Sequence, residues 1–129
     1  MGLMAVQTWE RAPGIIRDET GDRSEYVAFS SAYLSTNITI RTSDDSAFRI
    51  HEIQPSNTLQ WQVDKTDLRI CSVAQGVVRV KIGGADEFQI SLNGMWKVRR
   101  GVACSVTNPF HTKATLHVTS VSTANDQDW

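Results

Sequence analysis

The stretch GVVRVKIGGADEFQISL, from Gly76 to Leu92, decides the fold class of this chain. Its first seven residues alternate aliphatic side chains with Arg79 and Lys81, which is the two-residue period of a β-strand with one polar face. Its last six residues alternate again around Phe88 and Ile90. The GGADE segment between the two runs has the glycines and acidic residues that favour a hairpin connection. The stretch therefore predicts two antiparallel strands joined by a turn.

The same alternation continues on both sides of this hairpin. Upstream it predicts strands in NITIRT (37–42), AFRIHEI (47–53) and DLRICSV (67–73). Downstream, NGMWKVRRGVACSV (93–106) predicts two short strands around Gly101, and TLHVTSV (115–121) predicts the last strand. No window keeps a 3.6-residue period, although SEYVAFSSAYL (24–34) is compatible with a short helix. About seven or eight short strands with regular turns predict an all-β fold, and we favour a jelly-roll barrel.

The chain ends differ from this pattern. Residues 1–36 mix charges, glycine and proline with short apolar pieces, so we expect an N-terminal arm ahead of a barrel at 37–122, and a polar tail at 123–129. Aromatic residues in the arm predict that it docks, either on its own barrel or on a neighbouring chain. They are Trp9, Tyr26, Phe29 and Tyr33.

Composition narrows the possible functions. The chain has 129 residues, is 40% hydrophobic and 21% charged, and carries a net charge of −1, which gives no overall attraction to nucleic acid or anionic lipid. No apolar run approaches the ~20 residues of a membrane span, and Glu10 and Arg11 come too early for a secretory signal. The two cysteines, Cys71 and Cys104, lie in apolar strand-like runs. We expect them to be buried free thiols in an intracellular protein.

The segment VRRGVACSVTN (98–108) resembles the second metal-binding motif of cupin barrels. Gly101 takes the place of the turn glycine and Asn108 that of the motif asparagine. However, Arg99 stands where proline is usual, and Cys104 where the ligand histidine would be. The resemblance thus implies the geometry of a cupin barrel without its metal ligand.

The first cupin motif should lie in LQWQVDKTDLRICSVAQ (59–75), which contains no His-x-His pair. Ligands at alternate positions are needed because side chains two residues apart on a strand point to the same side. The alternating polar residues present, Gln60 and Gln62, are neutral amides and poor ligands for first-row transition metals.

The three histidines, His51, His111 and His117, form no local pair, and we expect them at the surface or in an interface. His117 is opposite in phase to Leu116 and Val118, which predicts that it points outward. There is no nucleophile elbow and no phosphate-binding loop. We therefore expect no enzyme and no cofactor. The alternative is a small-ligand binder or metal-dependent enzyme with an atypical pocket around Gln62, Cys71 and Cys104.

Several basic residues lie in predicted strands that could be neighbours in one sheet. A shared outer face would make them a stripe for phosphates or an acidic peptide. The other interpretation, which we favour, is a solvated face paired with Asp86 and Glu87. The candidate basic patch is Arg79, Lys81, Lys97, Arg99 and Arg100.

Beyond the motif, the run GVVRVKIGGADEFQISLNGMWKVRRGVACSVTNPFHTKATLHVTSV (76–121) resembles the C-terminal cupin domain of the centromere protein C family, particularly its fungal members. The similarity lies in the Gly-Val-Val-Arg-Val strand, the Asn-Gly-Met-aromatic turn, the Val-x-x-Gly segment and the closing Leu-His-Val-Thr strand. VAFSSAYL (27–34) and FRIHEIQPS (48–56) extend it upstream.

This resemblance implies a metal-free, non-catalytic cupin domain that forms a homodimer within an inner-kinetochore scaffold. It implies a location in the nucleus at the centromere and contacts with other kinetochore or chromatin proteins, but not with a membrane. The family's nucleosome-binding motif, an arginine-rich run ending in a Tyr-Trp-like pair, is absent here. Direct contact of this domain with DNA therefore stays open.

The aromatic content suggests where a dimer would form. Trp9, Trp61 and Trp129 lie outside the clearest strands, and together with Trp96 they exceed what a small barrel readily encloses, although they would also serve to cap its two ends. The residues that we expect at a dimer interface are Trp96, Met95, Val98, His117, Trp61 and Tyr33.

Overall fold

The computed structural model describes residues 5–20 and 24–122, so the predicted tail at 123–129 lies outside the described residues. The chain divides into two compact units, Met1–Ile38 and Thr39–Trp129. In the described ranges, no helix has the length and apolar character needed to cross a membrane.

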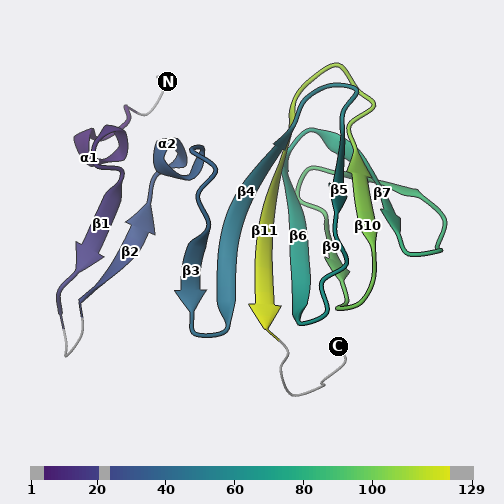
Figure 1. The fold of residues 1–129 in the computed structure, drawn as a ribbon. Helices are drawn as coiled ribbons and strands as arrows, with labels where there is room; N and C mark the ends of the chain where they lie inside the picture. Colours follow the sequence, from purple (N-terminus) through teal and green to yellow (C-terminus); the bar gives the residue numbers. More distant parts are fainter. Residues whose placement is uncertain (1–4, 21–23, 123–129) are drawn as a thin grey trace. The chain divides into compact units, whose positions relative to one another are not determined.

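The N-terminal unit is a two-stranded hairpin with one short helix before its first strand and another after its second strand (Figure 1). Its elements are α1 (Thr8–Arg11), β1 (Ile15–Asp18), β2 (Glu25–Phe29) and α2 (Ser31–Leu34). The two strands are antiparallel, with Ile15 opposite Phe29. The hydroxyl of Ser30 accepts a hydrogen bond from the Tyr33 N–H at 3.1 Å and begins α2.

The sequence predicted an irregular arm here, with a helix possible at 24–34. Instead, the first part of that segment forms β2, and only its last four residues form α2. The physical reason is that EYVAF contains aromatic and β-branched residues, which pack well on a pleated surface.

The C-terminal unit is a barrel of two antiparallel sheets, and it carries the candidate site (Figure 1). One sheet contains β3 (Ile40–Ser43), β4 (Ser46–Ile53), β11 (Ala114–Ser122), β6 (Asp67–Gln75) and β9 (Met95–Val98), in that order. The other contains β5 (Thr58–Trp61), β10 (Cys104–Thr107), β7 (Val77–Ile82) and β8 (Phe88–Ser91). The strands cross between the sheets in the manner of a jelly roll.

Most of the predicted strands are present. The opening stretch forms the β7–β8 hairpin, with Val77 opposite Ser91 and Val80 opposite Phe88. The turn at Asn93 and Gly94 joins β8 to β9, and Asn93 has a φ of 70° there. A Cβ at Gly94 would lie 2.5 Å from Cγ1 of Ile90, so this turn needs a glycine. Strand β5 was not predicted, because four residues with two apolar positions give too short an alternation.

The barrel core is formed by the inward side chains of both sheets. Valine and leucine dominate it, as expected for β-branched residues packed between sheets. Its most deeply buried aliphatic side chains are Val73, Val78, Val80, Val98, Val106 and Leu116.

Strands β4 and β6 each place an arginine inside the barrel and apolar side chains outside it. On β4, Arg49 pairs with Val118 and His51 pairs with Leu116, and these β11 partners are core residues. Arg49 and His51 therefore point between the sheets, because paired residues share a face. By the same reasoning, Phe48, opposite Thr119, points outward.

Strand β6 pairs with the other edge of β11 and alternates in the same way. Cys71 is buried in the core, and Ile70 lies on the outer face opposite Thr119. This phase creates a charged cavity inside the barrel and an apolar surface outside it.

Candidate functional site

The cupin-like motif is kept as a structural element. Gly101 has a φ of 80° in the connection between β9 and β10, and its N–H donates to the Asp64 carbonyl at 2.6 Å. Asn108 is 1% exposed. Its Nδ2 donates to the carbonyl oxygens of Ile53 at 2.9 Å and Thr112 at 2.8 Å. Asn108 therefore joins β4 to the loop before β11 through a fully satisfied buried amide.

The two cysteines are free and buried, as the sequence predicted. Burial, as the largest influence, and the nearby Cys104 raise the pKa of Cys71 to about 12, although Arg69 acts to lower it. Burial also raises the pKa of Cys104; the Trp96 indole N–H opposes this rise without forming a hydrogen bond of regular geometry. Since a thiolate is the form that binds metals and attacks electrophiles, both thiols are inert at neutral pH.

The place of the first cupin motif holds no ligand set. Gln60 is exposed and lies opposite Ser105, whereas Trp61 lies opposite the buried Cys104 and points inward. Gln62 follows β5 and is also exposed. Across residues 5–20 and 24–122, no group of three or more His, Cys, Asp or Glu side chains is arranged to hold a metal ion.

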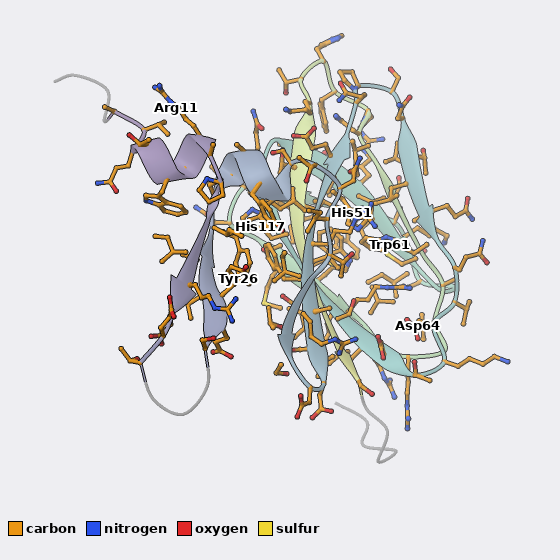
Figure 2. The ribbon with its side chains drawn as sticks, turned by 60° about the vertical axis from the view of Figure 1, so that its left-hand side comes forward. Arg11, Tyr26, His51, Trp61, Asp64 and His117 are labelled. Carbon is orange, nitrogen blue, oxygen red and sulfur yellow. The ribbon has the colours of Figure 1, made fainter. Side chains whose placement is uncertain are left out.

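A cavity of about 200 Å³ lies instead between β4, β5, β6 and β11, partly open to solvent. Its polar lining comes from Thr39, Arg49, His51, Arg69 and Ser120, and Trp61 forms one wall. Figure 2 shows His51 and Trp61 next to each other inside the barrel, and their ring centroids are 5.7 Å apart in an edge-to-face arrangement. We call this space the arginine cavity.

Arg69 is held in place from several sides. Its guanidinium lies 5.4 Å from the Trp61 ring centroid, Nη2 donates to the Gln62 carbonyl at 3.1 Å, and the Asp64 carboxylate is 3.7 Å away. Burial, the largest single influence, acts to raise the pKa of Asp64, but the N–H groups of Thr66 and Asp67 outweigh it and lower the pKa overall. Asp64 is thus a fixed anion beside Arg69 at the end of the barrel (Figure 2).

Arg49 has no such support. Its Nε is buried and makes no hydrogen bond within the part of the chain that the structure describes. Burial, as the largest influence, and the positive charges of Arg49 and Arg69 together lower the pKa of the neighbouring His51 to about 4. His51 is therefore neutral at pH 7.

The histidines are only partly where the sequence placed them. His117 is on the outer face as predicted, with its ring centroid 5.4 Å from that of Phe48. His111 lies in the exposed loop before β11. His51 corrects the expectation of a surface or interface position, because β4 turns it into the arginine cavity.

The opposite side of the five-stranded sheet carries apolar side chains that alternate with polar ones from strand to strand. One row across it contains Phe48, Thr119, Ile70 and Lys97, and the next contains Ile50, His117, Ser72 and Met95. Ile40 on β3 extends the first row beside Phe48. We define the outer sheet face as Ile40, Phe48, Ile50, Ile70, Met95 and His117. Met95 is 56% exposed on it.

The six residues expected at an interface occupy different places. Met95 and His117 lie on the outer sheet face. Trp96 and Val98 are buried in the core, since β9 turns these two positions inward, and Trp61 lines the arginine cavity. We therefore remove these three from the expected surface. Tyr33 lies in α2 of the N-terminal unit.

The basic residues do not form one stripe. Arg79 and Lys81 are on the outside of the four-stranded sheet, while Lys97 is on the outside of the five-stranded sheet. Lys81 Nζ donates to the carbonyl of Ala85 at 2.6 Å. Arg99 and Arg100 follow β9, and both have interaction partners. The residues of the candidate basic patch are thus divided between the two sheets.

Sequence analysis missed the arginine cavity. The signal was present in AFRIHEI, where Arg49, His51 and Ile53 share one phase, but this phase looks like the solvated side of an amphipathic strand. Strand phase is set by the neighbouring strand β11, which the local pattern does not contain.

The class of fold that this geometry defines is the cupin, or double-stranded β-helix. The cupin domain of Cnp3 from Schizosaccharomyces pombe superposes with a TM-score of 0.70 at 16% sequence identity, covering 87% of this chain and 90% of that chain. A cupin protein from Bacteroides fragilis superposes with a TM-score of 0.59 at 7% identity, covering 72% of this chain and 83% of that one. An oxalate oxidase superposes at 0.57 with 18% identity, over 60% of this chain and 42% of the enzyme. No family model and no curated protein matches the sequence.

These similarities confirm the predicted all-β, cupin-type jelly roll. At such low identity they show the fold alone. The cupin fold includes an enzyme such as oxalate oxidase as well as the Cnp3 domain, so the fold does not decide between catalysis and assembly.

Proposed function

We propose that this chain is a non-catalytic homodimerisation domain of an inner-kinetochore scaffold protein, and that the outer sheet face forms the dimer interface. The observation that carries this proposal is the phase of β4 and β6, which turns Phe48, Ile50 and Ile70 away from the core.

The outer sheet face has the composition of an interface. An antiparallel sheet with one solvated side normally shows polar residues there. Here half-buried aromatic and aliphatic side chains on β3, β4 and β6 and the exposed Met95 on β9 lie among the polar residues of β11, with Lys97 at the rim on β9. Aromatic residues and methionine are enriched in the centres of protein interfaces. A sheet face packed across a twofold axis forms an isologous interface, in which each contact between two residues occurs twice.

The N-terminal hairpin gives a second argument. A two-stranded hairpin is marginal in water by itself. Ile16, Tyr26 and Val27 are each at least 40% exposed. These side chains need a surface that covers them, and a dimer supplies more such surface than one chain does.

The chemistry of the barrel interior supports a role without catalysis. The cupin ligand position holds Cys104, whose pKa is raised by burial, and its neighbour Trp61 offers no metal ligand. The divided basic patch gives no continuous track for a nucleic-acid backbone. The kinetochore assignment depends on the sequence motifs shared with the centromere protein C family and is supported by the similarity to the Cnp3 domain over 87% of this chain.

Sedimentation of the full chain tests the dimer. We expect the wild-type chain to be a dimer at micromolar concentration. Either Met95→Lys or Ile50→Lys should raise the dissociation constant of the dimer at least tenfold, so that the monomer predominates. Met95 is the safer position because it is 56% exposed. Gln89→Lys, which places the same charge on the exposed side of the four-stranded sheet, is the matched control and should remain dimeric.

A wild-type monomer at all concentrations would overturn the proposal, as would a dimer that tolerates both outer-face variants. Elemental analysis of the same sample tests the competing enzyme hypothesis, since stoichiometric iron, manganese or zinc would favour a metal-dependent cupin. Fluorescent tagging tests the location: we expect foci that coincide with centromeric nucleosomes, and diffuse fluorescence would contradict the kinetochore assignment.

A further inference from the structure

The arginine cavity has a charge that the rest of the barrel does not neutralise. Two guanidinium groups, Arg49 and Arg69, line it, and no aspartate or glutamate is among its described lining residues. Asp64 partly balances Arg69 from 3.7 Å away, but the buried Nε of Arg49 has no hydrogen-bond partner in the described part of the chain. A buried guanidinium N–H without an acceptor is costly, so a structure that keeps one inside a cavity is suited to an incoming acceptor.

The positions of these groups suit a single anion. Arg49 lies opposite Val118 on β11, Arg69 lies opposite Ser120 one row further along, and all four side chains line the same cavity. Ser120 adds a hydroxyl between the two arginines. The planar guanidinium fork matches the two oxygens of a carboxylate or phosphate. The cavity thus offers converging donors at its polar side.

The other walls indicate an organic ligand. Trp61 and Val118 are apolar and face the same space as the arginines. Ligand sites typically combine such apolar walls with a few directed polar groups. At about 200 Å³ the cavity is smaller than the ~300–1,000 Å³ of drug-sized pockets, which limits the ligand to a small molecule. Inorganic phosphate has no apolar group to pack against the Trp61 indole.

We propose that the arginine cavity binds a small organic carboxylate, with its carboxylate on Arg49 and Arg69 and its apolar body against Trp61. The site needs no metal, and its proposed ligand contacts, Arg49, Arg69 and Trp61, are not residues of the outer sheet face; Phe48 is common to the cavity lining and to that face. The site is therefore independent of the proposed dimer, and either proposal can fail without the other.

His51 provides a local reporter. It lines the cavity together with both arginines, and its pKa is lowered by burial first and by Arg49 and Arg69 second. A bound carboxylate offsets these positive charges and should move the His51 ring resonances and raise the pKa of this ring. A ligand elsewhere on the barrel would not reproduce this response.

Titration of the full chain with benzoate, followed by NMR, tests the proposal. We expect saturable shifts at His51 and at the Trp61 indole, and no shifts from benzamide, which has the same shape without the charge. Inorganic phosphate should bind at least tenfold more weakly than benzoate. Arg49→Gln should weaken benzoate binding at least tenfold, Arg49→Lys should weaken it less, and Arg79→Gln, on the exposed face of β7, should leave it unchanged.

Three results would overturn this inference. They are the absence of saturable benzoate shifts at His51 and Trp61, equal responses to benzoate and benzamide, and unchanged binding in a folded Arg49→Gln variant. If Arg49→Gln does not fold, the wild-type comparison of the two probes decides the question. Phosphate that binds as well as benzoate would reject an organic ligand.

Discussion

At the scale of single residues, the buried amide of Asn108 and the cationic environment of His51 show two different uses of polar side chains inside a β-barrel. Asn108 has its hydrogen-bond partners within the barrel and contributes order to the loop before β11. In the arginine cavity, by contrast, the buried Nε of Arg49 has no hydrogen-bond partner in the described part of the chain, and burial and two nearby positive charges keep His51 neutral. Polar groups with no structural partner mark the places where a barrel can do more than fold.

The stability of the barrel should depend on pH through His51. Its pKa in the folded state is about 4, below the 6.5 of an ordinary histidine, so the unfolded chain binds more protons between these values. Stability should be constant above pH 6.5 and fall by about 1–2 kcal/mol as the pH drops to 4, after allowance for solvent screening of a partly exposed ring. Urea unfolding at fixed ionic strength measures this.

His51→Gln should remove most of this slope. The carboxylates of Asp18 and Asp64 have lowered pKa values in the folded state, so their contribution is lost only below the window of His51. A slope that persists in His51→Gln, or a His51 ring that titrates near 6.5 by NMR, would contradict this assignment.

At the scale of elements, the β8–β9 turn is the connection whose chemistry is most directly visible in the sequence. Asn93 adopts a φ of 70°, which asparagine and glycine tolerate and β-branched residues do not. Its N–H donates to the Val73 carbonyl at 2.9 Å, and this bond is available to any residue except proline.

The effect of a substitution at Asn93 on the free energy of unfolding should therefore depend on how well the new residue adopts a positive φ. Asn93→Gly should change the free energy of unfolding by less than about 0.5 kcal/mol, while Asn93→Val should destabilise the barrel by about 1–3 kcal/mol. Paired denaturant unfolding curves provide the measurement, and equal midpoints for the two variants would contradict the prediction.

The elements also show how far the sequence could predict this structure. Hairpins such as β7–β8 were predictable, because their alternation and turn chemistry are local. The phase of β4 was not, since its register depends on β11, more than sixty residues later in the chain. Both the arginine cavity and the outer sheet face depend on this phase. The cysteines were predictable because their apolar surroundings are sequential neighbours.

At the scale of the whole molecule, the proposed dimer would use residues other than those that form the core. The core cluster contains none of the side chains of the outer sheet face. A dimer built on that face would add stability by mass action without changing the core.

Thermal unfolding of the wild-type chain should therefore depend on protein concentration. We expect the Tm to fall by a few degrees for each tenfold dilution through the dimer Kd. Met95→Lys should show no such dependence and should match the wild-type Tm at high dilution. A wild-type Tm that does not change with concentration would indicate a monomer.

The position of β11 has a consequence for biosynthesis. This strand is the last in the described chain, yet it lies at the centre of the five-stranded sheet, between β4 and β6, and supplies Ala114, Leu116 and Val118 to the core. A ribosome therefore releases all the other strands of the barrel before the one that joins them. Until β11 emerges, β4 and β6 have no partner on their inner edges, and the nascent barrel cannot close.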